Sequence, residues 1–270
     1  MDMKLSEPYS PDCLSSTGKK VAVIGGGPCG LAATYHLTQR GHQCVVFDKN
    51  ECPGGMLRSG SLRETLPLEV LDCEIGLIFD LGGNFQGSRE LGRDFSIEEL
   101  REEFDAVFLA FGETANRPPV SLPLKMREKK IHTVGNTYQT SIKGVFAGGG
   151  AIGSRRLCVR AVADGKEAAA AMDQYLRGLA VKGIERKFNS RLGELTEEEW
   201  AKFASEADPR DRIEPEDTKT GFSVEEADIE AHRCLHCDCR KKKNCDLRRL
   251  STELKALSGT YKGGRRHYAR

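Results

Sequence analysis

A glycine-rich turn near the amino end constrains the fold of this chain more than any other feature. The glycines of this turn, Gly25, Gly27 and Gly30, follow the apolar run 21–24. A segment of helical character, 31–40, comes directly after them. A short apolar run predicts a buried parallel strand, and a second such run lies at 44–47. Because the connections are so short, the pattern predicts one β-α-β unit of a parallel sheet covered by helices.

The same turn has the residue types of a loop that binds a dinucleotide. Gly25 fits a tight turn, Gly27 leaves bare backbone for a pyrophosphate, and Gly30 lets helix and strand approach closely. Pro28 is compatible with the first helical turn, whose N–H groups attract anions. Asp48 ends the next strand, where a carboxylate accepts hydrogen bonds from ribose hydroxyls. The loop predicts dinucleotide binding without choosing the dinucleotide, and a glycine-rich turn of some other α/β protein is the alternative.

Further segments extend the predicted α/β domain. Apolar positions at helical spacing predict a helix over 68–79, and Ser96 predicts the cap of a short helix over 95–103. Three more segments read as two buried strands and one long alanine-rich helix: 106–110, 144–147 and 157–176. Later segments predict helices near 196–203 and 224–233 on either side of a polar linker.

A series of motifs along this domain resembles the FAD domain of the glutamate synthase small (beta) subunit family, within the pyridine nucleotide-disulfide oxidoreductase superfamily. The matching segments are 21–33, 53–58, 66–75, 104–112, 137–149 and 161–169. The resemblance implies a Rossmann-type FAD-binding domain, with Gly54 near the flavin end. The residues that it implies for cofactor binding are Gly25, Gly27, Pro28, Gly30, Asp48, Lys49, Gly55, Met56, Leu57, Arg58, Gly112, Gly149 and Gly150.

Two departures from the family pattern change what is expected. Full members insert a second Rossmann domain, for NADPH, between the two FAD segments. Only about 24 residues separate Gly112 from Thr137, whereas a β-α-β unit needs about 30. We therefore expect no nicotinamide domain and no direct NAD(P)H oxidation by the usual route. Gly150 stands where the family has an Asp that holds a ribitol hydroxyl, so we expect either a weaker flavin site or contacts shifted to backbone amides. A fold that has lost its cofactor is the alternative.

Four of the ten cysteines lie close together near the carboxyl end: Cys234, Cys237, Cys239 and Cys245. Four thiolates suit an iron–sulfur cluster or a zinc ion, and neighbouring basic residues would offset their negative charge. The spacing alone does not choose the metal. The family context and the need for an electron route favour a [4Fe–4S] cluster, with structural zinc and metal-free thiols as alternatives.

Composition restricts the class of protein. The net charge of +1 argues against an obligatory nucleic-acid partner, and no apolar run approaches the roughly 20 residues of a membrane span. The first residues lack an apolar signal core, so we expect a cytoplasmic protein with reduced thiols. We expect four parts. A flexible leader, 1–18, precedes the FAD-binding domain, 19–180. A helical or linker segment, 181–222, is followed by a helix with a four-cysteine metal-binding tail, 223–270.

These expectations combine into one functional hypothesis. The chain is predicted to be an FAD-dependent oxidoreductase subunit that relays electrons between flavin, iron–sulfur cluster and a partner protein or subunit. An NAD(P)H-dependent oxidoreductase like the glutamate synthase small subunit is one alternative, and a non-catalytic assembly module with a vestigial nucleotide fold is another. No side chain stands out as a catalytic acid or base. His36 and His42 are predicted to be surface residues.

Overall fold

The computed structural model describes residues 11–59, 66–113, 123–128, 130–153, 157–184, 196–205, 207–216, 221–233 and 246–254. Its internal contacts divide the chain into two compact units. One unit is Ser10–Glu185, and the other joins the first nine residues to Arg186–Arg270.

The centre of the unit Ser10–Glu185 is a five-stranded parallel sheet in the order β3-β2-β1-β4-β7. The strands are β1 Lys20–Ile24, β2 Gln43–Phe47, β3 Asn84–Gln86, β4 Ala106–Leu109 and β7 Val145–Ala147. All of β4 and β7 and most of β1 are buried, because helices cover both faces of the sheet. The predicted α/β Rossmann-type fold is confirmed.

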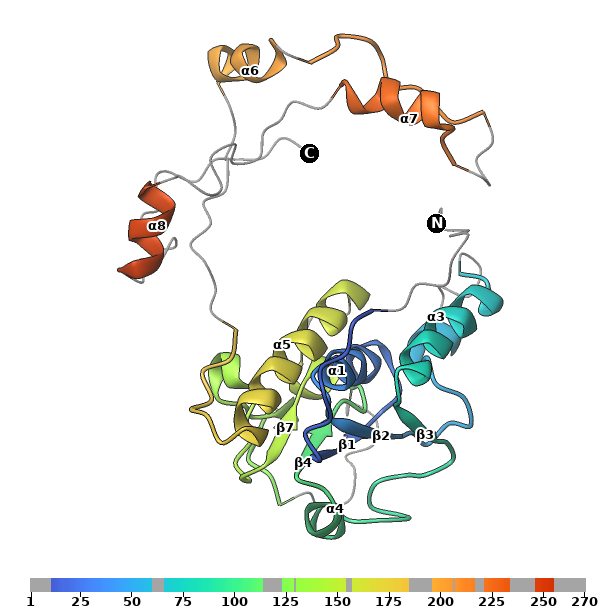
Figure 1. Cartoon of the computed structure of the whole chain (residues 1–270), viewed down its shortest axis with the longest axis vertical. Coiled ribbons are helices and arrows are strands. Elements are labelled where there is room, and N and C mark those ends of the chain that lie inside the picture. Colours follow the sequence, from blue (N-terminus) through green and yellow to red (C-terminus); the bar gives the residue numbers. More distant parts are fainter. Residues whose placement is uncertain are drawn as a thin grey trace. The chain divides into compact units, whose positions relative to one another are not determined.

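Helices form a layer on each side of the sheet (Figure 1). The helices α1 Pro28–Gln39 and α5 Cys158–Leu176 pack on one face over Val21, Val23 and Phe108. The short helix α4 Ile97–Glu103 covers the other face over Ala22 and Val107. Ser96 caps α4 in a reciprocal capping box with Glu99, as its sequence predicts.

Several smaller elements complete this unit. The helix α3 Leu68–Asp80 packs beside α1, and the short helix α2 Met56–Ser59 precedes it. The segment between β4 and β7 carries an antiparallel hairpin of β5 Met126–Arg127 and β6 Lys130–Ile131, then the 3-10 helix η2 Gly135–Thr137. A second 3-10 helix, η3 Gly149–Ile152, follows β7.

Residues 11–18 have defined contacts, although the sequence predicts a loose leader there. The backbone N–H of Leu14 donates to the carbonyl of Gln39 at 2.8 Å, and that of Thr17 donates to the carbonyl of Gly41 at 2.9 Å. The segment therefore runs along the carboxyl end of α1. Gly41 has φ +85°, and a side chain there would collide with the Ser15 carbonyl, so only glycine fits at this contact.

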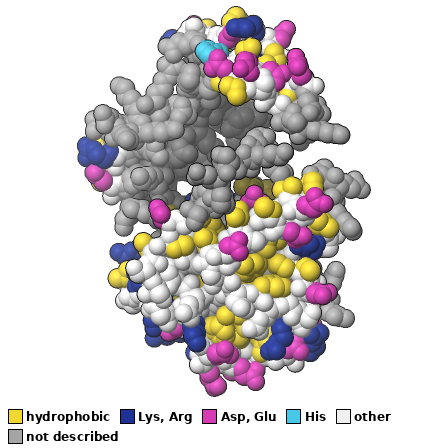
Figure 2. All heavy atoms as spheres, turned by 45° about the vertical axis from the view of Figure 1, so that its right-hand side comes forward, with side chains coloured by type: hydrophobic (Ala, Val, Ile, Leu, Met, Phe, Trp, Pro, Cys, Tyr) yellow, Lys and Arg dark blue, Asp and Glu magenta, His cyan; other side chains and the backbone are white. Residues whose placement is uncertain are grey.

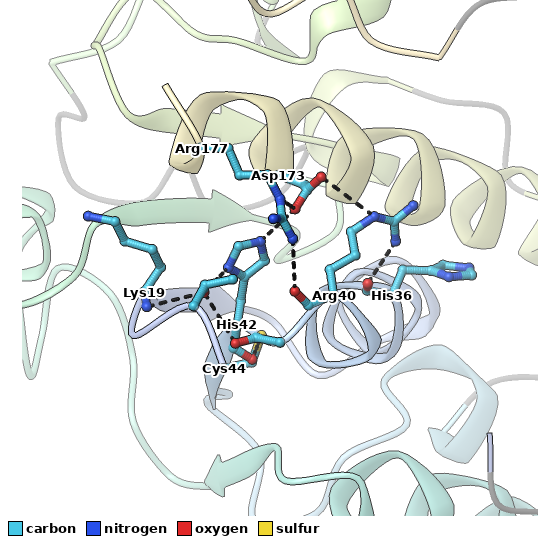
Figure 3. A network of polar contacts seen from close by, with 9 residues as sticks. Lys19, His36, Arg40, His42, Cys44, Asp173 and Arg177 are labelled. Carbon is cyan, nitrogen blue, oxygen red and sulfur yellow. Dashed lines mark hydrogen bonds and ion pairs between the residues drawn. The ribbon is translucent and has the colours of Figure 1, made fainter. Parts of the chain in front are cut away.

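The prediction that His42 lies on the surface is wrong. Its side chain is fully buried in the polar network of Figure 3. Nδ1 lies 2.7 Å from the Thr17 hydroxyl, and Nε2 lies 2.9 Å from the Asp173 carboxylate. Arg177 donates to the same carboxylate at 2.7 Å. Burial lowers the pKa of His42, although its bond to Asp173 opposes the shift. The network ties the amino-terminal segment to α5.

The second unit contains three described helices: α6 Glu197–Ala204, α7 Val224–Ala231 and α8 Asp246–Glu253. Ser223 caps α7 in a capping box with Glu226, which confirms the cap that its sequence predicts. Among the residues that the structure describes, no helix is long and apolar enough to cross a membrane.

Candidate dinucleotide site

Two glycines of the turn after β1 are required by the packing of the backbone. Gly25 has φ +112°, and a Cβ atom there would lie 2.5 Å from the Ala110 carbonyl oxygen. A Cβ on Gly30 would collide with the Gly25 carbonyl. The turn therefore brings the start of α1 directly against the ends of β1 and β4, as the sequence predicts.

Gly27 is different, because it leaves open space. A Cβ atom on Gly27 would meet nothing within 4 Å. Gly27 is also the N-cap of α1, which has no side-chain cap and no acidic residue in its first turn, and Pro28 occupies the first position. Uncapped N–H groups and the helix dipole make such a terminus attract anions. The residues present therefore fit the pyrophosphate of a dinucleotide.

Asp48 is buried at the end of β2 and fastens the glycine turn. Its Oδ2 accepts from the Gly26 N–H at 2.6 Å, and its Oδ1 accepts from the backbone and side-chain N–H groups of Asn50 at 2.8 and 2.9 Å. A carboxylate has about four acceptor sites, so Asp48 keeps acceptor capacity for ribose hydroxyls. Asn50 was not singled out by the sequence, although its position two residues after Asp48 is typical of an Asx-type turn.

The turn 53–55 is packed onto the glycine loop. The Gly54 N–H donates to the Gly26 carbonyl at 2.7 Å, and a Cβ on Gly55 would lie 2.9 Å from the Gly27 Cα. Arg58 holds this turn, because its Nε donates to the Pro53 carbonyl at 2.8 Å and its guanidinium pairs with Asp72. The Arg58 guanidinium thus stabilises the turn 53–55 through contacts within the protein.

The remaining residues expected beside this turn differ in exposure. Met56 is 71% exposed, and Lys49 is also exposed. Leu57 is partly buried and packs against Leu71 and Ile75. Figure 2 shows apolar side chains reaching the surface of the unit Ser10–Glu185 among charged ones; exposed examples at the start of α2 and α5 are Met56, Leu157, Val159 and Val162.

The glycines after β7 are packed against α1 and against the end of β4. The Cys29 sulfur would lie 3.2 Å from a Cβ on Gly148 or Gly149, so Cys29 fills the space beside these glycines. A Cβ on Gly150 would lie 2.9 Å from the Gly112 carbonyl carbon and the Glu113 nitrogen. A carboxylate side chain would not fit at position 150 without a backbone shift, so this part of the site offers backbone groups.

The glycines 148, 150 and 153 repeat the spacing of the first loop, which the sequence reasoning missed. This second run begins the 3-10 helix η3, however, and its strand belongs to the same sheet. Within the described residues it therefore does not form a second nucleotide unit.

The buried Tyr138 lies close to two carboxylates of α5. The Tyr138 hydroxyl lies 3.1 Å from Asp164 Oδ1 and 2.9 Å from Glu167 Oε2, and burial raises the pKa of Tyr138. Burial, followed by the charge of Asp164, also raises the pKa of Cys29. The thiol of Cys29 therefore stays protonated at neutral pH and is a poor nucleophile.

The four cysteines predicted to bind metal lie outside the described residues: Cys234, Cys237, Cys239 and Cys245. Among the residues that the structure does describe, no group of three or more His, Cys, Asp or Glu side chains has a metal-binding arrangement. Six cysteines in the described ranges are free thiols. The metal site stays a prediction.

Comparison with known proteins identifies the same segment. A family model described as an NAD(P)-binding Rossmann-like domain matches residues 23–89. The glutamate synthase [NADPH] small chain of Mycobacterium tuberculosis is 42% identical over 112 residues, which make up 42% of this chain and 22% of that protein. The NAD-dependent dihydropyrimidine dehydrogenase subunit PreT of Salmonella typhimurium is 41% identical over 104 residues, which make up 38% of this chain and 25% of that protein.

A solved structure of a thioredoxin reductase from Gloeobacter violaceus aligns with 61% of this chain and 97% of its own, at 15% identity and a TM-score of 0.42. The matched segments cover no more than a quarter of the two relatives above. Over the matched segment, the chain is similar to the glutamate synthase small chain, and residues 23–89 match a Rossmann-like domain, in agreement with the motifs of the sequence.

Proposed function

We propose that this chain is an FAD-containing electron-transfer subunit of an oxidoreductase. The observation that carries the proposal is the open space at Gly27 beside the uncapped start of α1, with the Asp48 carboxylate at the end of the neighbouring strand. An anion-binding helix terminus next to a ribose-binding carboxylate is the arrangement that a dinucleotide requires.

Each part of the site has a separate role in this proposal. The backbone N–H groups of Cys29 and Gly30 bind the pyrophosphate, and Asp48 accepts from the adenosine ribose. The turn 53–58 and the backbone of Gly149 and Gly150 bind the flavin half. FAD, when bound, exchanges electrons one or two at a time. The motifs that extend beyond the first loop support FAD over NAD.

The electrons reach and leave the site through other proteins or subunits. The segment from Gly112 to Thr137 contains a hairpin where an NADPH domain would be inserted, which supports an electron donor other than NAD(P)H. The names of two relatives, a small chain and a subunit, support a role within a larger assembly. Six free thiols in the described ranges support a reducing compartment such as the cytoplasm.

The four-cysteine segment supplies the second redox centre of this proposal. Four thiolates at Cys234, Cys237, Cys239 and Cys245 would hold a [4Fe–4S] cluster that exchanges electrons with the partner. Anaerobic purification, an optical spectrum, iron and zinc analysis, and EPR after dithionite test this part. Flavin bands with four irons are expected. Zinc without iron would mean that the segment is a structural zinc site. The absence of flavin bands would contradict the proposal as a whole.

A single added methyl group provides a sharp test of the flavin site. Gly27 has an ordinary negative φ of −81° and no atom near its Cβ position, so Gly27→Ala preserves the fold and fills only the space assigned to the pyrophosphate. We expect this variant to be purified without flavin and to unfold at the same urea concentration as the unmodified protein from which the flavin has been removed. Gly76→Ala, in α3, is the matched control because its Cβ also meets nothing within 4 Å. Equal flavin content in both variants would place the pyrophosphate elsewhere.

A second measurement separates the relay from a self-sufficient enzyme. NADH and NADPH, added without oxygen to the purified chain, are expected to leave the flavin absorbance unchanged, whereas dithionite bleaches it. Bleaching by either nicotinamide would favour the alternative, an NAD(P)H-dependent oxidoreductase like the glutamate synthase small chain.

A further inference from the structure

Arg89 is an exposed cation without an ion-pair partner in the described part of the chain. Its guanidinium carbon lies over the ring of Phe95, 5.6 Å from the ring centroid. The two acidic side chains nearest in sequence, Glu90 and Asp94, pair with Arg93 instead. One face of the Arg89 guanidinium is thus covered by an aromatic ring.

The backbone places Arg89 beside the residue proposed to bind ribose. The Arg89 N–H donates to the Asp48 carbonyl at 2.9 Å, and the preceding Ser88 donates to the Asn50 carbonyl at 3.1 Å. Ser88 has φ +58°, a conformation that costs roughly 1 kcal/mol for a residue other than glycine. These bonds fix the start of the Arg89 side chain at the carboxyl end of β2.

The direction of a bound dinucleotide follows from the strand order. The pyrophosphate site lies at the end of β1, and the ribose site lies at the end of its neighbour β2. Since the base is attached beyond the ribose, it extends away from β1 toward β3. Arg89 follows β3 by three residues, so its side chain lies on the path of the base.

We propose that Arg89 is an adenine-binding residue, whose guanidinium plane stacks between the purine ring and Phe95. This inference rests on the proposed dinucleotide site. Arginine suits such a position because its planar, delocalised cation stacks on aromatic faces, whereas lysine carries a compact point charge. The ring behind it is held firmly, since Phe95 packs against Phe47 with ring centroids 5.0 Å apart.

Calorimetric titration of the flavin-free protein with ADP tests the proposal, because ADP carries the base, ribose and pyrophosphate without the flavin. We expect Arg89→Ala and Arg89→Lys to raise the Kd for ADP by a similar factor, about two- to fivefold. Arg101→Lys and Arg101→Ala, at an exposed arginine of α4, are the matched controls and should bind ADP like the unmodified protein. Inorganic pyrophosphate should bind all five proteins equally.

The outcomes are distinguishable from failure of the dinucleotide site itself. If the unmodified protein binds neither ADP nor FAD, the site proposed above is wrong. If it binds ADP and the two Arg89 variants bind it equally well, the adenine contact is wrong. If Arg89→Lys binds like the unmodified protein and only Arg89→Ala is weaker, or if pyrophosphate binding falls as well, Arg89 acts through charge and the stacking proposal is overturned.

Discussion

His42 shows how one buried residue links the amino-terminal segment to the last helix of the sheet domain. Both ring nitrogens have partners, Thr17 on one side and Asp173 on the other. Burial of Asp173 alone would raise its pKa, but the bonds from Arg177 and His42 lower it. The sequence did not reveal this network, because its members lie far apart in the chain and His42 resembles a polar residue in a surface turn.

The network predicts a loss of stability at acidic pH. Because burial lowers the pKa of His42, the unfolded chain takes up a proton at a higher pH than the folded protein does. The His42 contribution is therefore complete above the unfolded pKa of about 6.5 and declines as the pH falls below it. Urea unfolding of the unmodified protein should show this decline, and His42→Gln should lower stability by about 1–3 kcal/mol at neutral pH and flatten the decline.

The matched control is His132→Gln, which removes an exposed histidine. We expect it to leave the pH profile of stability unchanged. If the free energy of unfolding of His42→Gln declines with the same slope as the pH falls, other groups cause the loss of stability at acidic pH.

At the scale of elements, the sequence predicts those parts whose burial pattern is continuous. The strands β1, β2, β4 and β7 are apolar runs because both faces of the sheet are covered, and such runs can be recognised without a structure. The edge strand β3 was missed because its three residues are Asn-Phe-Gln and it lies at the edge of the sheet. The approach of Arg58 to Asp72 was also missed, since it depends on how α2 and α3 meet.

The crossing of α1 and α5 predicts a strong effect of one small substitution. A Cβ on Gly165 would collide with the Cys29 carbonyl, so Gly165→Ala must push the two helices apart. We expect a loss of about 1–3 kcal/mol in the free energy of unfolding, because overpacking a close contact strains its surroundings. The same change in an open helical position, Gly76→Ala, should raise stability by about 0.4–1 kcal/mol. Equal effects on urea unfolding would show that α1 and α5 do not meet at Gly165.

At the scale of the whole molecule, the chain contains two units, each with its own internal contacts: the sheet domain and a charged extension. The sheet domain contains every residue proposed to bind the dinucleotide, from Gly25 to Gly150. The four cysteines belong to the other unit. Motifs could predict which glycines the turn after β1 requires, because Gly25 and Gly30 are dictated by backbone geometry. The metal could not be chosen from the sequence, since four thiolates suit both zinc and iron.

This division predicts that the proposed flavin site and the proposed metal site can be separated by substitution. Replacing Cys234, Cys237, Cys239 and Cys245 by Ser should remove the proposed metal and leave the flavin content unchanged, because the proposed flavin contacts lie in the unit Ser10–Glu185. Reduction of the flavin by dithionite should persist, while electron transfer to a protein acceptor should be lost. Serine at Cys13, Cys52, Cys73 and Cys158, four exposed thiols, is the matched control and should change neither property. Loss of flavin from the first variant would mean that the cysteine segment also supports the flavin site, and the relay would then depend on both units folding together.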